Sequence, residues 1–178
     1  MAEVRESRAE RIVIEGYALS LGSTYLGQPF ETVPVDATVD RTFSIPPTPT
    51  RVESLLPERP AVEVWLIAPE HQFAEKLHAL TRTYGQQGRP STRPSDLVDL
   101  VALIQRGLLD RALTRRAVHE VFAARGTHRI PTVIPRPAEW ENAFRLYGRG
   151  YGLGETSLDE GVTIVQGFYA ELGLDQNS

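Results

Sequence analysis

The hydrophobic pattern of the chain changes once, near Pro69, and this change restricts the fold more than any other feature. Three segments before it are rich in Val and Ile, as β-strands are: residues 11–19, 30–40 and 61–67. After it, apolar residues recur three or four positions apart, which is the period of an amphipathic helix. Strands followed by helices predict an α+β fold, with a small antiparallel sheet followed by a C-terminal helical bundle. We expect a β-rich part over residues 1–67 and a helical part packed on it over residues 68–178.

Turn and loop residues divide the predicted strands. Gly22 to Gly27 predict a turn, so that the first two strands are adjacent and antiparallel. Pro34 predicts an edge position or a bulge for the second strand. Five prolines within residues 44–60 predict a crossing loop with a short turn at 52–56.

Five helices are expected in the second part, because start and stop residues flank each periodic segment. They begin at Pro69, at a Ser95 cap, near residue 110, near Pro137 and at Ser157, where Glu160 completes a capping box. Gly107 and Gly126 are expected to end the second and third helices. The second helix is apolar almost all round, which predicts that it forms the buried centre of the bundle.

Composition excludes several classes of protein. The 178 residues include no cysteine, so a disulfide framework and thiolate chemistry are excluded. The chain has four histidines, which provide few ligands for a histidine metal site. No apolar run approaches the roughly 20 residues that cross a bilayer. Residues 1–11 are charged and lack the apolar segment of a secretory signal, so we expect a cytoplasmic protein with no membrane partner.

Charge is distributed unevenly along the chain. Residues 76–149 hold thirteen cationic side chains against six acidic ones, whereas the flanking segments are acidic and the whole chain has a net charge of −4. A basic middle fits a surface that meets phosphates, and Arg-rich helix faces in water explain it equally well. Aromatic residues do not alternate with the arginines, so sequence-specific binding of single strands is not supported.

Lysine is nearly absent, since the chain has eighteen arginines and Lys76 alone. An ammonium is compact and strongly hydrated, so a site that requires a point charge does not accept arginine. Asp96 and Asp99 lie three residues apart and therefore share one helix face. Asp96 suits the first turn of a helix, whereas Asp99 lies among apolar neighbours and needs a cationic partner such as Lys76. A structural ion pair and a catalytic cluster both remain open.

Five segments resemble the nucleotidyltransferase AbiEii/AbiGii toxin family, over nearly the whole chain. They are FETVPVDATVD (30–40), PEHQFAEKLHALTRTY (69–84), RPSDLVDLVALI (93–104), FAARGTHRIP (122–131) and PRPAEWENAF (135–144). The resemblance implies a toxin of a type IV-like abortive-infection system, with a cognate antitoxin as partner. It also implies transfer of a nucleotide from an NTP to the 3′ end of tRNA, and it makes the sheet a remnant of a nucleotidyltransferase fold.

The resemblance also assigns roles to individual residues. Lys76 matches the lysine that contacts the NTP phosphates, and Arg82 is assigned to the nucleotide beside it. Asp96 and Asp99 match the two acids of the catalytic helix. Asp36 matches a carboxylate on a strand that holds Mg²⁺, and in such sites carboxylates bind metal and help to activate the attacking hydroxyl.

The chain departs from the family pattern in two places. It contains no Asp-x-Asp pair, which is the main metal clamp of the family, and Ser95 replaces the usual cation before the aspartate. We therefore expect a family member that lacks its N-terminal portion and has weak or no transferase activity alone. The alternatives are a non-catalytic module that binds RNA or antitoxin, and a helical domain in which the Lys76 ion pair is only structural. For His128 in the RGTH segment we favour a helix-ending loop, because Gly126 is a natural C-cap.

Overall fold

The computed structural model describes residues 5–12, 16–38, 45–54, 58–83 and 93–175. The chain divides into two compact units, Met1–Arg41 and Thr42–Ser178. In the described residues the first unit consists of strands, and the second of a β-hairpin followed by helices, which confirms the α+β class. The division expected after residue 67 falls inside the second unit, between its hairpin and its first helix.

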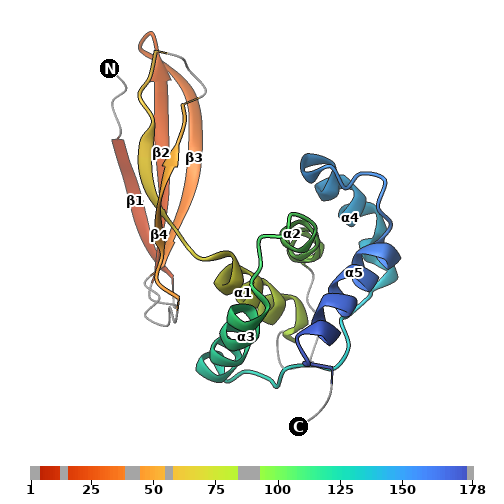
Figure 1. The fold of residues 1–178 in the computed structure, drawn as a ribbon. Helices are drawn as coiled ribbons and strands as arrows, with labels where there is room; N and C mark the ends of the chain where they lie inside the picture. Colours follow the sequence, from red (N-terminus) through yellow and green to blue (C-terminus); the bar gives the residue numbers. More distant parts are fainter. Residues whose placement is uncertain (1–4, 13–15, 39–44, 55–57, 84–92, 176–178) are drawn as a thin grey trace. The chain divides into compact units, whose positions relative to one another are not determined.

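The first unit is a three-stranded antiparallel sheet in the order β1-β2-β3 (Figure 1). Its strands are β1 (Arg5–Ile12), β2 (Gly16–Tyr25) and β3 (Gln28–Thr38). Leu26 and Gly27 join β2 to β3 with φ of 50° and 78°. Positive φ at both central residues suits a tight hairpin whose twist matches that of the strands.

Two expectations for this unit are wrong and one is confirmed. Residues 11–19 do not form one strand, because they are divided between β1 and β2. The charged sequence of β1 carries no strand pattern, so its pairing with β2 decides its conformation. The turn expected from Gly22 is confined to Leu26 and Gly27, since β2 continues to Tyr25. Pro34 lies on β3, an edge strand of the sheet, as expected.

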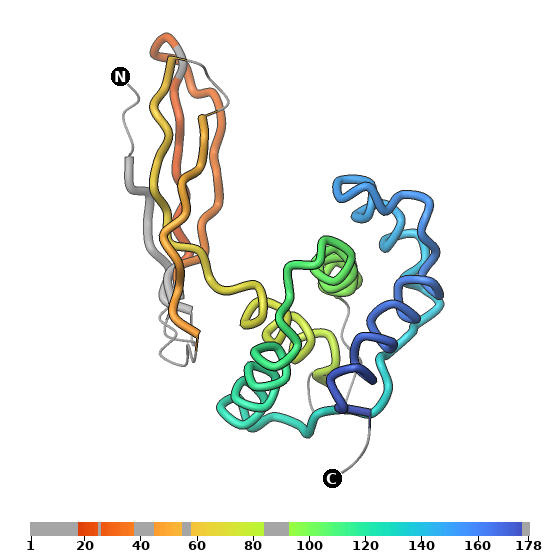
Figure 2. Tube along the Cα trace, in the orientation of Figure 1, coloured from red at the N-terminus to blue at the C-terminus, as the bar shows by residue number. Residues whose placement is uncertain are grey.

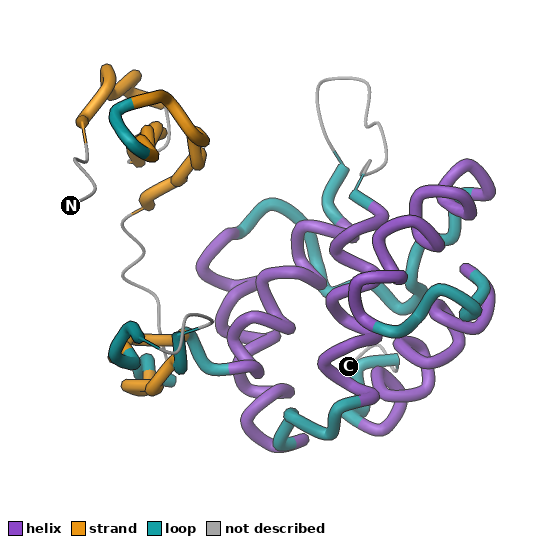
Figure 3. Tube along the Cα trace, turned by 90° about the horizontal axis from the view of Figure 1, so that it is seen from above, coloured by secondary structure: helices purple, strands orange, loops and turns teal. Residues whose placement is uncertain are grey.

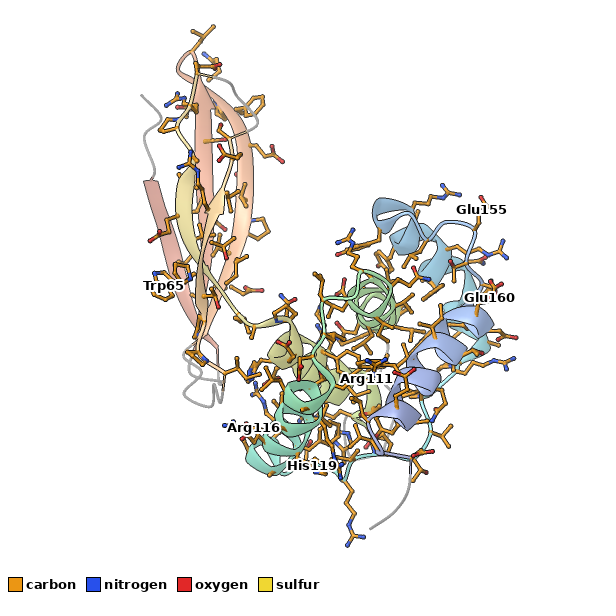
Figure 4. All side chains as sticks on the ribbon, viewed as in Figure 1. Trp65, Arg111, Arg116, His119, Glu155 and Glu160 are labelled. Atoms are coloured by element: carbon orange, nitrogen blue, oxygen red, sulfur yellow. The ribbon has the colours of Figure 1, made fainter. Side chains whose placement is uncertain are left out.

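The second unit begins with a two-stranded hairpin of β4 (Thr48–Val52) and β5 (Val62–Leu66). β5 confirms the strand expected at 61–67, whereas β4 contradicts the loop expected over 44–60. Both strands of such a hairpin are edges, so the missing N–H of Pro49 is tolerated there. Residues of both strands are exposed or half-buried, and Trp65 is 68% exposed (Figure 4).

Helices are the remaining regular elements of the described chain, and Figure 2 follows them in sequence order. They are α1 (Pro69–Thr81), α2 (Pro94–Gln105), α3 (Arg111–Arg125), α4 (Glu141–Gly148) and α5 (Leu158–Glu171), with short 3-10 helices η1 (Ala138–Trp140) and η2 (Arg149–Tyr151). The Ser157–Glu160 capping box of α5 is confirmed. Ser95 does not cap α2, because Pro94 already occupies the first turn, where its fixed φ and missing N–H are favourable.

α2 forms the centre of the helical bundle, as predicted. Its residues Leu97, Val98, Leu100 and Val101 are completely buried. α1, α4 and α5 all pack against it, and α1 also packs against α3. Figure 3 shows the helices gathered in one bundle. The buried core is therefore helical, and α1 and α2 face each other within it.

Within the described residues, no helix has the length and apolar character that crossing a bilayer requires.

Candidate functional site

Lys76 lies at the border of the buried face of α1. Phe73, Leu77 and Leu80 on the same helix are almost completely buried, and they hold α1 in the core. The side chain of Lys76 is 33% exposed, so it is only partly covered by the core.

Two carboxylates of α2 converge on this ammonium. Lys76 Nζ lies 3.0 Å from Asp96 Oδ1 and 2.6 Å from Asp99 Oδ2. The other oxygen of Asp96 pairs with Nε of Arg93, 3.0 Å away. The ion pair expected between Lys76 and Asp99 is thus confirmed, and Asp96 joins it.

Lys76, Asp96, Asp99 and Arg93 form one charged cluster, here called the Lys76 cluster. Its electrostatics keep Lys76 charged. Burial alone lowers the pKa of Lys76, but hydrogen bonds to Asp99 and Asp96 and the charges of both carboxylates outweigh it and raise the pKa above its ordinary value. Asp96 is 0% exposed, so its charge is compensated inside the protein by Lys76 and Arg93. Asp99 is 23% exposed and remains accessible from outside.

A cavity of about 410 Å³ opens beside the cluster. Its lining residues come from α1, from α2 and the turn after it, and from η2: Gln72, Lys76, Asp99, Ala102, Leu103, Arg106, Leu108 and Tyr151. The phenol of Tyr151 donates a hydrogen bond to Asp99, which raises the pKa of Tyr151, and the charge of Asp99 and burial act in the same direction. The guanidinium carbon of Arg106 lies 5.6 Å from the centre of the Tyr151 ring. The cavity thus presents two cations, one carboxylate and one aromatic ring.

Arg82 and Asp36, the remaining predicted site residues, belong to different units of the chain. Arg82 is the exposed C-cap of α1 and does not line this cavity. Asp36 is exposed on β3, opposite Ala18, in the first unit, and its role as a metal ligand stays a prediction. Asp40, expected in the same strand, lies outside the described residues.

The described part of the chain does not fit a magnesium site. It contains no group of three or more His, Asp or Glu side chains placed to hold a metal ion. Asp96 and Asp99, the acids nearest the cavity, already pair with Lys76. Since Mg²⁺ requires near-octahedral oxygen ligation, these two carboxylates alone do not form its site.

The RGTH segment (125–128) ends α3 and forms hydrogen bonds with side chains of α1. Gly126 has a φ of 58° and is the C-cap of α3, which confirms the loop interpretation. Thr127 Oγ1 lies 2.8 Å from Nε2 of His78, and Nε2 of His128 lies 2.9 Å from Thr81 Oγ1. Burial, and then the positive charges nearby, lower the pKa of His78 to about 4, so this ring is neutral at pH 7.

The basic middle of the chain is largely paired within the protein. Two arginines of α3, both labelled in Figure 4, illustrate this: Arg111 lies 2.7 Å from Glu171, and Arg116 lies 2.8 Å from Glu120. Further pairs join Arg93 to Asp96, Arg125 to Glu75, Arg136 to Asp159 and Arg145 to Glu141. These contacts favour the interpretation of residues 76–149 as Arg-rich helix faces in water over that of a continuous phosphate-binding surface.

Sequence reasoning missed Arg93 and Tyr151. Arg93 lies three residues before Asp96, a spacing that places the two side chains together at the start of a helix. Tyr151 stands within the glycine-rich run Gly148 to Gly154, whose turn brings it to α2. The glycines signal a tight turn, but no sequence pattern names its neighbour across the fold.

The chain matches the family model of the nucleotidyl transferase AbiEii toxin of type IV toxin–antitoxin systems over residues 2–157. The match covers nearly all of the first unit and the second unit as far as Ser157, including Lys76, Arg93, Asp96 and Asp99. A search of curated proteins gave no significant match.

Proposed function

The chain belongs to the AbiEii nucleotidyl transferase toxin family, and from this we propose that the Lys76 cavity binds the phosphates of an NTP for nucleotide transfer to RNA. The observation that carries the proposal is the position of Lys76, whose ammonium is held by Asp96 and Asp99 at the wall of a cavity of about 410 Å³. The acceptor we propose is the 3′ end of a tRNA. NTPs and tRNA meet in the cytoplasm, where an abortive-infection toxin and its cognate antitoxin would act.

The chemistry of the reaction requires such a cation. A hydroxyl oxygen of the acceptor forms a bond to the α-phosphorus, the bond from that phosphorus to the bridging oxygen breaks, and pyrophosphate leaves with the electron pair. Negative charge accumulates on the departing phosphates, so a fixed positive charge lowers the barrier. Lys76 supplies this charge, because its raised pKa keeps it protonated at pH 7.

The two carboxylates differ in what they can reach. Asp99 lies on the cavity wall and is partly exposed, so it is our candidate to accept the proton of the attacking hydroxyl. Asp96 is completely buried, and we assign it the task of holding Lys76 in place.

Magnesium neutralises phosphate charge in many enzymes of this class of reaction. The carboxylates of the described residues do not form a site for it. The chain also has no Asp-x-Asp pair. We therefore propose that this polypeptide binds NTP through Lys76 but transfers nucleotide weakly or not at all by itself.

Two measurements on the full chain test the proposal. Isothermal titration with ATP, GTP, CTP and UTP should detect binding that Lys76→Gln weakens by about tenfold, a value typical of a lost charged contact. Arg149→Gln, which removes an exposed cation that does not line the cavity, is the matched control. Labelled NTPs with Mg²⁺ and tRNA should give little or no product. Absence of NTP binding, or equal binding by Lys76→Gln, contradicts the nucleotide site, and Lys76-dependent labelling at high yield contradicts the proposed weakness.

The alternative is a non-catalytic module that binds RNA or antitoxin. The internal pairing of the arginines gives the RNA version no specific support. Salt-dependent RNA binding that Lys76→Gln leaves unchanged, in a chain that binds no NTP, would favour it over our proposal.

A further inference from the structure

Arg106 and Tyr151 line the same cavity as Lys76. Arg106 is the C-cap of α2 and is exposed to solvent. Within the described residues it forms no ion pair, unlike Arg111 and Arg116 of α3. Its neighbour is instead the ring of Tyr151, whose centre lies 5.6 Å from the guanidinium carbon.

This arrangement leaves the guanidinium free to bind an anion. A cation above an aromatic ring is attracted to its face, and the N–H groups of a guanidinium point along its own plane. The ring therefore restrains Arg106 without using the charge that a carboxylate partner would neutralise. The acids near the cavity, Asp96 and Asp99, are matched by Lys76 and Arg93, so Arg106 is a surplus positive charge at this wall.

The turn that carries Tyr151 is built tightly. Gly152 has a φ of 79°, which L side chains rarely adopt. A Cβ at Gly148 would lie 3.1 Å from Cβ of Leu153, which is itself buried. Both glycines thus fix the path of η2, and with it the place where the Tyr151 ring meets α2. Tyr151 also donates to Asp99, so one side chain touches both Arg106 and the Lys76 cluster.

We propose that Arg106 is a second phosphate-binding residue of the Lys76 cavity and that Tyr151 positions it. The ligand class is a polyphosphate, which the NTP of the proposed function supplies, and the inference rests on that function. Lys76 and Arg106 then contact phosphate groups from α1 and from the end of α2, while the ring of Tyr151 restricts where the guanidinium can lie.

The experiment measures binding of tripolyphosphate and of the four NTPs to the full chain by isothermal titration. Arg106→Gln should weaken binding of tripolyphosphate and of the preferred NTP by about tenfold, and Arg106→Lys should restore part of it. Arg149→Gln, on the adjacent 3-10 helix, is the matched control and should change binding by less than about twofold. Unchanged thermal unfolding of Arg106→Gln shows that the variant is folded.

The positioning role of Tyr151 has its own readout. Tyr151→Phe keeps the ring and should bind close to wild type, whereas Tyr151→Leu should bind as weakly as Arg106→Gln. In a Tyr151→Leu background, Arg106→Gln should add little further loss, because the two side chains act as a unit. Independent losses in the double variant would overturn the positioning role.

Failure of this inference is distinguishable from failure of the proposed function. If Lys76→Gln weakens NTP binding while Arg106→Gln behaves like Arg149→Gln, the inference is overturned and the proposed function stands. If the wild-type chain binds neither an NTP nor tripolyphosphate, both are overturned.

Discussion

Lys76 Nζ lies 3.0 Å from Asp96 Oδ1, although twenty residues separate these side chains in the sequence. Asp96 is completely buried, whereas one third of the Lys76 side chain is exposed. The pair therefore connects the interior of the bundle with the wall of the cavity. The buried carboxylate of Asp96 fixes the position of the ammonium, and the partial exposure of Lys76 makes its charge available to a ligand.

Removing Lys76 should destabilise the fold as well as ligand binding. Lys76→Met leaves the buried Asp96 with Arg93 as its cationic partner, so we expect the free energy of unfolding to fall by about 2–3 kcal/mol in urea titrations. Arg111→Gln is the control, because its pair with Glu171 is exposed and should contribute less than about 1 kcal/mol. Equal losses in the two variants would contradict a structural role for the Lys76 pair.

The two acids of α2 should differ in their effect on stability. Asp96→Asn removes a buried charge that has two cationic partners, and we expect a loss of about 2 kcal/mol in the free energy of unfolding. Asp99→Asn affects a partly exposed carboxylate, so its loss should be no more than about half as large. Chemical denaturation of both variants under one condition makes the comparison, and the reverse order would show that burial does not decide the effect.

His78 should make stability depend on pH. Its folded pKa of about 4 lies below the value of about 6.5 expected in the unfolded chain. Between these values the unfolded state binds more protons, so the free energy of unfolding falls as the pH falls, by at most about 1.4 kcal/mol per pH unit from this ring. Thermal unfolding from pH 7 to pH 5 should show a flatter profile in His78→Gln.

His119→Gln is the matched control, because His119 is exposed on α3 (Figure 4). This variant should keep the wild-type slope. His128, whose pKa is also lowered, chiefly by burial, contributes with the same sign, so some slope should remain in His78→Gln. A His78→Gln profile that coincides with wild type would contradict the assignment.

Substitution by alanine should change the free energy of unfolding in opposite directions at two glycines of α5. A Cβ at Gly161 would lie 2.5 Å from Cζ of the completely buried Phe144, so Gly161→Ala should cost about 1–3 kcal/mol. Gly167 is exposed and has no atom within 4 Å of its Cβ position. Gly167→Ala should therefore stabilise the protein by about 0.5–1 kcal/mol, as measured by thermal or urea unfolding. Destabilisation by both changes would show that the helix, not the Phe144 contact, sets the cost.

Local chemistry determined what the sequence could predict by itself. The α+β class, the capping box at Ser157 and the stop at Gly126 each depend on residues close together in the chain. The three-residue spacing of Asp96 and Asp99 likewise places them on one helix face without reference to the rest of the fold. Lys76 could be singled out because it is the sole lysine.

Contacts between distant segments were decided by the tertiary structure. Pairing with β2 makes a strand of the charged residues of β1, and pairing with β5 does so for the proline-containing β4. The link from Tyr151 to Asp99 spans two helices and a glycine-rich turn. Such pairings depend on how buried faces pack, and a helix or strand pattern in the sequence specifies a buried face without specifying which segment covers it.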